Sequence, residues 1–193
     1  MNFKLRLCTA VAAVLLAGNV LAHDLETEEQ QLGYIIGMDI GKSLRDQGTE
    51  IDLGIAALIP EDYLPDVHQR LILYKRIASA NNKDELRELQ VEMIDRFGLL
   101  PVPLKNLIAV TELKLKATPM GLLKIDLGED GGRIVFNKEP NIDLMQVVQL
   151  VQTQANFYKF DGANKLRITK PLPTIEKRFE EINRLLDSFS SPQ

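Results

Sequence analysis

Residues 74–101 constrain the fold of this chain most strongly, because they hold the end of one amphipathic helix and the whole of a second. Their apolar residues recur at spacings of three and four, which is typical of helices that pack one face on a core. Asn81-Asn82 predicts a turn between the helices, and Gly98 predicts the end of the second one, which we place at about 83–97. In the first helix, which starts near Asp66, the inward-facing residues that we predict are Val67, Leu71, Tyr74 and either Ile77 or Ala78. In the second they are Leu86, Leu89, Met93 and Phe97.

Helices and short strands follow each other in the rest of the chain. The turn sequence GEDGG at 128–132 lies between two apolar runs and is a strong hairpin signal. We therefore expect an α+β fold, with helices and two short β-hairpins in one compact domain at 54–193, preceded by a long N-terminal helix. The expected elements are a third helix after Pro103, strands at 122–127 and 133–136, a helix at 142–153, strands at 157–160 and 165–168, and a last helix at about 174–189.

The residue content gives no sign of an active site. The single cysteine, Cys8, excludes a Cys-based zinc site, and the two histidines, His23 and His68, lack metal-ligand spacing. No phosphate-binding loop motif is present, and the Glu180-Glu181 pair is predicted to lie on a solvated helix face. We expect no catalytic residues, no cofactor and no metal. The net charge of -4 favours no direct binding of nucleic acid.

The second helix carries an acidic ridge on the face opposite its apolar residues. Glu85, Glu88, Glu92 and Asp95 recur at i, i+3, i+7 and i+10, and Arg96 lies beside them. Such a ridge is either an ordinary solvated face or a surface for a basic partner.

The first 22 residues have the pattern of a Sec-type signal peptide. Lys4 and Arg6 form a positive start, residues 9–20 form a short apolar core, and small residues precede a cleavage site after Ala22. The alternative is an N-terminal anchor or a buried helix. Cleavage would leave no stable membrane span and would place the mature chain in the periplasm.

Residues 23–53 form an N-terminal segment in which we predict a helix from Thr27 to Gln47, ended by Gly48, with a glycine on every turn of one face. Gly33, Gly37 and Gly41 recur every four residues and would let another backbone approach closely. The helix is read either as a dimer-forming helix or as one that packs on its own domain. Residues 32–53 resemble the N-terminal dimerisation segment of exported FKBP-type peptidyl-prolyl isomerases of the macrophage infectivity potentiator kind. That resemblance implies a homodimer, but no isomerase domain follows.

A second resemblance covers most of the chain, from about residue 50 to residue 189. The motifs YKRIASA (74–80), IDRFGLLP (94–101) and YKFDGANKLRI (158–168) resemble the C-terminal module of the bacterial transcription-repair coupling factor. In that family the module is not catalytic, and it packs on a UvrB-like module and masks the surface that recruits UvrA. The resemblance implies that Glu92 and Asp95 contact that partner, and Glu88 and Arg96 complete the predicted partner-binding set.

Three interpretations remain open from the sequence. The main one is a non-catalytic interaction and autoregulatory module of transcription-coupled DNA repair, which would act in the cytoplasm. The second is an exported, dimeric holdase-like protein that uses the glycine-bearing helix. The third is a gene fusion without function, joined near residues 49–53.

The leader gives a direct prediction. We expect the N-terminal mass of the expressed protein to correspond to a chain that begins at His23, and we expect that chain in the periplasmic fraction. Intact-protein mass spectrometry after cell fractionation checks both. An unprocessed chain in the cytosol would contradict the export prediction.

Overall fold

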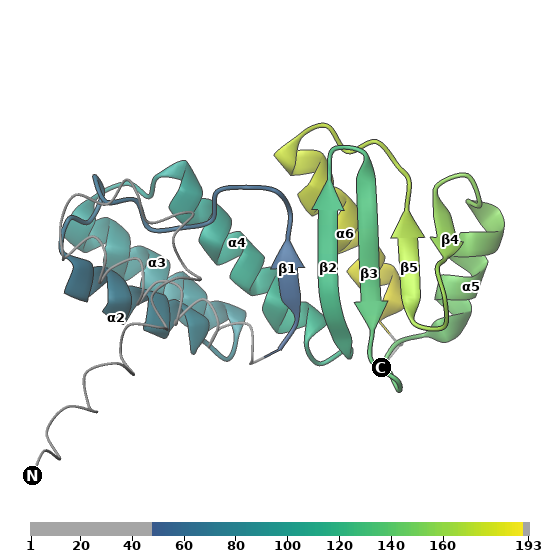
Figure 1. The fold of residues 1–193 in the computed structure, drawn as a ribbon. Helices are drawn as coiled ribbons and strands as arrows, with labels where there is room; N and C mark the ends of the chain where they lie inside the picture. The colour runs from purple at the N-terminus through teal and green to yellow at the C-terminus, as the bar shows by residue number, and fades with distance from the viewer. Residues whose placement is uncertain (1–47, 191–193) are drawn as a thin grey trace, which may run out of the picture. The chain divides into compact units, whose positions relative to one another are not determined.

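The computed structural model describes residues 48–190, and Figure 1 shows how their helices and strands are arranged. A short strand is followed by three helices, a strand pair, a helix, a second strand pair and a last helix. This is the predicted α+β architecture. The elements are β1 (Glu50–Asp52), α2 (Val67–Ala78), α3 (Lys83–Phe97), α4 (Val102–Ala117), β2 (Leu122–Gly128), β3 (Gly131–Phe136), α5 (Leu144–Thr153), β4 (Tyr158–Phe160), β5 (Lys165–Ile168) and α6 (Ile175–Phe189).

The predicted signal peptide and the residues Gly33, Gly37 and Gly41 lie outside the described part of the chain, so cleavage and dimerisation stay predictions. No helix between residues 48 and 190 is long and apolar enough to cross a membrane. The predicted N-terminal helix, which ends at Gln47, also lies outside the described part. Residues 50–52, which follow it in the chain, form strand β1.

Strand β1 joins the start of the domain to the sheet. Its three residues pair in parallel with residues 124–126 of β2. The buried Thr49 anchors the strand, since its hydroxyl donates a hydrogen bond to the Leu122 carbonyl oxygen at 2.7 Å. The sequence did not predict β1 because three residues are too few to show an alternating pattern and their partner strand lies far along the chain.

Both predicted hairpins are present, and pairing between β3 and β5 joins them into one sheet with the order β1-β2-β3-β5-β4. Two glycines of the GEDGG turn allow the strands on both sides of β3 to approach closely. A Cβ on Gly132 would lie 1.9 Å from the Asp126 carbonyl oxygen in β2. A Cβ on Gly131, whose φ is +113°, would lie 2.1 Å from the Ile168 carbonyl oxygen in β5. A larger residue at either position would push the strands apart.

The helix ends follow the residues that the sequence marks. The Asp66 side chain accepts a hydrogen bond from the Gln69 backbone N–H at 2.8 Å and caps α2. Thr174 caps α6 in the same way, through the Lys177 backbone N–H. Gly98 ends α3 with φ of +88°, a conformation that favours glycine. These local signals explain why the helix limits could be predicted closely.

The inward face was predicted correctly for α3 and only in part for α2, where Ile77 is buried as predicted. Leu86, Leu89 and Met93 of α3 are buried. In α2 the buried residues are Leu73 and Ile77, whereas the predicted Val67 and Leu71 are only partly buried. Residues 71–73 are three consecutive apolar residues, so periodicity alone does not select the one that faces inward.

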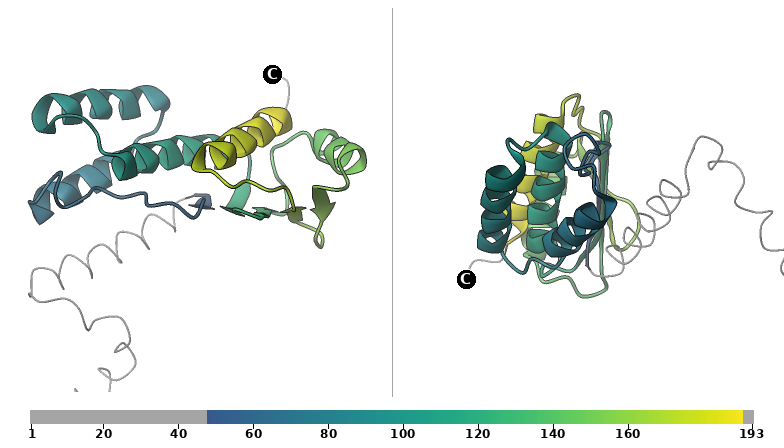
Figure 2. Two further views of the ribbon diagram at one scale, coloured as in Figure 1. Left: turned by 90° about the horizontal axis from the view of Figure 1, so that it is seen from above. Right: turned by 90° about the vertical axis from the view of Figure 1, so that its left-hand side faces the viewer.

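The apolar residues form two clusters that share helix α4. Leu104 and Ile108, in the first half of α4, pack with α2 and α3. Leu113 and Ala117, in the second half, pack with the sheet and with α5 and α6. Figure 2 shows α4, α5 and α6 on the same face of the sheet. Helix α4 therefore holds the helical part of the domain against the sheet.

Glu181 of α6 is buried, with 4% of its surface exposed, so the prediction of a solvated Glu180-Glu181 pair is wrong for this residue. Its carboxylate accepts hydrogen bonds from the Tyr158 hydroxyl, from Lys170 Nζ at 2.5 Å and from Arg184 at 2.6 Å. Burial tends to raise the pKa of Glu181, but these three hydrogen bonds hold it below its ordinary value. The sequence could not distinguish Glu181 from the exposed Glu180, because two of its partners come from outside α6.

The buried carboxylate generates a stability prediction. We expect Glu181→Ala to lower the free energy of unfolding by about 2 kcal/mol, because the buried Tyr158 hydroxyl loses its acceptor while Lys170 and Arg184 can still reach water. Urea unfolding at neutral pH measures the change. The matched control, Glu180→Ala, alters an exposed neighbour and is expected to stay within about 0.5 kcal/mol of the parent. Equal effects of the two substitutions would contradict the role given to Glu181.

A candidate docking surface on helix α3

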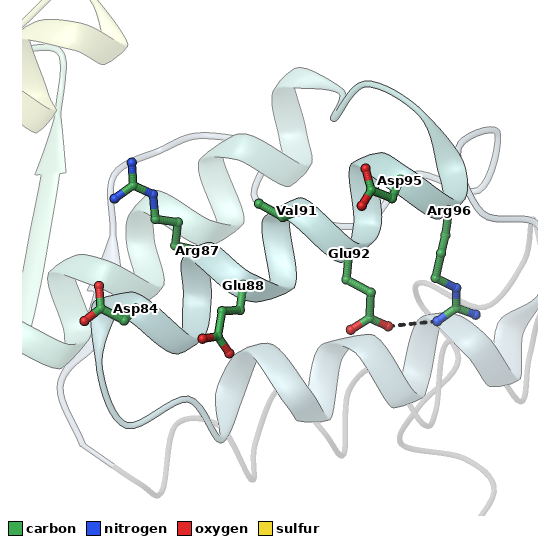
Figure 3. Close-up of a pocket in the computed structure, with 7 residues that line it drawn as sticks. All are labelled: Asp84, Arg87, Glu88, Val91, Glu92, Asp95 and Arg96. Carbon is green, nitrogen blue, oxygen red and sulfur yellow. Dashed lines mark hydrogen bonds and ion pairs between the residues drawn. The ribbon is translucent and has the colours of Figure 1, made fainter.

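Among residues 48–190, no group of three or more His, Cys, Asp or Glu side chains is placed to hold a metal ion. The surface that the sequence singles out is the outward face of α3, which Figure 3 shows. The apolar residues of α3 face the helical cluster, so its charged residues are left on the outside. We call this outward face the α3 surface, and it consists of Asp84, Arg87, Glu88, Val91, Glu92, Asp95 and Arg96.

Glu85, the first member of the predicted acidic ridge, belongs to the helix start. Its backbone N–H donates a hydrogen bond to the Asn82 side chain at 2.9 Å, which makes Asn82 the N-cap of α3. The Glu85 carboxylate accepts hydrogen bonds from the Asn81 backbone N–H at 2.8 Å and from the Asn82 side-chain amide at 2.9 Å. This reciprocal arrangement resembles a capping box, with the backbone N–H of Asn81 in place of that of the N-cap residue, so Glu85 stabilises the start of the helix.

Glu92 is held between two arginines. Arg76 of α2 donates to both of its carboxylate oxygens, at 2.8 and 2.6 Å, and Arg96 donates to one of them at 2.9 Å. The hydrogen bonds from Arg76 and Arg96 lower the pKa of Glu92 from its ordinary 4.5 to about 2. A bidentate pair of this kind fixes geometry as well as charge, so Glu92 holds α2 and α3 in register.

Arg96 is likewise engaged inside the domain. Besides its contact with Glu92, its guanidinium lies 4.8 Å from the centre of the Phe97 ring. This is within the range of a cation–π contact. Two of the four predicted partner-binding residues, Glu92 and Arg96, are therefore already paired with other residues of the chain.

Glu88 and Asp95 are the two predicted carboxylates that remain. Both are exposed, and neither forms a hydrogen bond or an ion pair within the described part of the chain. They lie seven residues apart, which is two helical turns or about 10.5 Å along the axis. Val91 stands between them with 55% of its surface exposed. The α3 surface thus offers two available carboxylates on either side of an apolar side chain.

The sequence analysis missed an exposed apolar group at the end of α3. Leu99 is 86% exposed and Val102 is 64% exposed, while Leu100 between them is buried. Ile94 of α3 is also exposed. The available signal was the Leu99-Leu100 pair after the helix end at Gly98, although two consecutive apolar residues do not show which of them is buried.

Together, these observations define a small α+β domain whose outstanding surface is a charged helix face with exposed apolar residues at its end. Charged residues around exposed apolar side chains are typical of surfaces that bind other proteins.

Residues 53–147 match the family model of the TRCF domain. A solved structure described as the C-terminal domain of transcription-repair coupling factor has the same fold. It matches with a TM-score of 0.62 at 21% sequence identity and covers 73% of this chain and 91% of that one. The predicted fold class and the second resemblance are confirmed.

Curated relatives are transcription-repair-coupling factors. The protein of Haemophilus influenzae is 37% identical over 190 residues, which cover 91% of this chain and 17% of that protein. The protein of Escherichia coli K12 is 32% identical over 185 residues, which cover 88% of this chain and 16% of that protein. The chain thus spans about a sixth of the length of these relatives. Each match covers a larger share of the chain than residues 54–193 account for. Each match therefore extends into the N-terminal segment.

The contact between Glu92 and the two arginines predicts a pH dependence. The unfolded chain takes up a proton on Glu92 near pH 4.5 and the folded chain near pH 2, so acid favours unfolding within this interval. We therefore expect the free energy of unfolding of the parent to fall more steeply between these pH values than that of Glu92→Gln. Urea unfolding at several pH values measures both curves.

All other acidic groups are shared by the two proteins, so the difference between the curves reports on Glu92. At neutral pH the substitution should cost less than about 1 kcal/mol, because all three side chains are partly exposed. Parallel curves would contradict the proposed contact.

Proposed function

We propose that this domain is a non-catalytic interaction module of DNA repair, which docks through the α3 surface on the UvrB-like module of a coupling factor. The observation that carries the proposal is the pair of available carboxylates, Glu88 and Asp95, on a domain that matches the TRCF family model. The family resemblance supports a protein partner, since the corresponding module of coupling factors acts by contact with a neighbouring module.

The geometry favours a partner with two basic side chains about 10 Å apart, flanking a small apolar patch. Glu88 and Asp95 would each pair with one of them, and Val91 would be covered between them. Burial of an exposed valine contributes favourable free energy, whereas exposed charge pairs mainly set the approach rate and the specificity. Leu99 at the end of the helix would extend the apolar contact.

The structure changes the role that we give to Glu92. In the family resemblance, Glu92 contacts the partner directly together with Asp95. Here its carboxylate is already bound by Arg76 and Arg96, so a basic partner residue would have to compete with both. We therefore propose that Glu92 and Arg96 position the helix, and that Glu88 and Asp95 make the first contact.

The proposed function includes the cytoplasm as the compartment in which the domain acts. A role in DNA repair requires an unprocessed chain in the cytoplasm, whereas the predicted signal peptide would export it. The fractionation experiment given above therefore also decides whether the α3 surface can meet a repair protein in the cell.

Charge reversal of the two available carboxylates tests the proposed function. We expect the double variant Glu88→Lys with Asp95→Lys to bind an isolated UvrB-like module of a coupling factor at least about tenfold more weakly, because attraction is replaced by repulsion. Binding is measured by interferometry at low and at physiological salt, and attraction in the parent should weaken as salt rises.

The matched control is Glu139→Lys with Glu180→Lys, which makes the same change in net charge at two exposed sites away from α3. Circular dichroism of all three proteins confirms that they are folded. Unchanged affinity of the α3 variant, or an equal loss in the control, would remove the α3 surface from the proposal.

A further inference from the structure

One face of the sheet is left without a helix by the described residues. Helices α4, α5 and α6 lie together on the opposite face (Figure 2), where the buried residues of the strands point. Because side chains alternate along a strand, the intervening residues of each strand point to the uncovered face. These are Glu50 and Asp52 in β1, Lys124 and Asp126 in β2, Arg133 and Val135 in β3, Lys165 and Arg167 in β5, and Lys159 in β4.

Three cations form a row across this face. Strand register places Arg133 of β3 directly opposite Arg167 of β5, and Arg167 directly opposite Lys159 of β4. Neighbouring strands lie about 4.8 Å apart, so the row is about 10 Å long. The side chains of Arg133 and Arg167 are 52% and 58% exposed. We call Arg133, Arg167 and Lys159 the basic row.

Like charges directly opposite each other on neighbouring strands reduce the stability of a sheet. The chain offsets only part of this repulsion. Arg133 pairs with Asp126 at 3.3 Å and Arg167 pairs with Asp161 at 2.8 Å, both at the surface. Lys159 and the nearby Lys165 have no ion pair within the described part of the chain. The basic row therefore keeps a surplus of positive charge.

We propose that the basic row is a second docking surface, which binds an acidic segment of a partner protein. Its arginines already bind carboxylates of this chain, so the surface has the chemistry that carboxylate recognition needs. These exposed pairs are worth little, and a partner carboxylate can replace them at small cost. The site is opposite in charge to the α3 surface and independent of it.

The carboxylates that lie around the basic row favour a short acidic segment over a long polyanion. Asp126 and Asp52 follow it on the β2 and β1 side, and Asp161 lies beside its other end. A continuous phosphate backbone that extended past the row would meet these carboxylates, whereas a short acidic segment would end before them.

The experiment measures binding of a fluorescein-labelled oligoglutamate peptide to the full chain by fluorescence anisotropy. We compare the parent with Lys159→Gln plus Arg167→Gln, and with the control Lys75→Gln plus Lys105→Gln, which removes the same charge from exposed helix residues elsewhere. We expect the variant of the row to bind about tenfold more weakly and the control to bind like the parent. Raising the salt concentration should weaken binding to the parent.

Three results would overturn the proposal. An equal loss in both variants would show attraction by overall charge alone. Tighter binding of a single-stranded DNA oligonucleotide at the same salt, lost on changing the row, would make it a nucleic-acid surface. Sedimentation of the unliganded parent as a dimer that the row variant dissociates would make the occupant a second copy. Thermal unfolding of each variant confirms that a loss of binding is not a loss of fold.

Discussion

Helix α4 is the element on which the rest of the domain depends, because its two halves lie in two different apolar clusters. Leu104 and Ile108 complete the packing of α2 and α3, whereas Leu113 and Ala117 cover the sheet. Since one rigid helix contributes residues to both clusters, it fixes the position of the helical part relative to the sheet. The α3 surface and the basic row are therefore presented by one body, with their opposite charges on different elements.

The sequence predicted those features that local residues determine. Asp66, Thr174 and Gly98 mark helix ends through contacts within one turn, and the GEDGG turn marks the first hairpin. Strand β1 and the pairing of the two hairpins escaped prediction, because they depend on contacts between distant segments. Local patterns carry no information about such contacts.

The same distinction holds for the charged residues of the site. The spacing of Glu88, Glu92 and Asp95 correctly placed them on one helix face, and Arg96 four residues after Glu92 was a visible partner. Arg76 was not, because it comes from another helix. That one contact separates a carboxylate that serves the fold from two that are available to a partner. Glu181 and Glu180 differ for the same reason.

Strand β1 also has a mechanical consequence. It is held by three residue pairs on the edge of the sheet and by the hydroxyl of Thr49, and the preceding chain enters the domain through it. Tension applied to that preceding chain would load β1 before any other element. Its release would expose the edge of β2 while both apolar clusters stayed largely packed. We therefore expect β1 to be the first element to detach under tension.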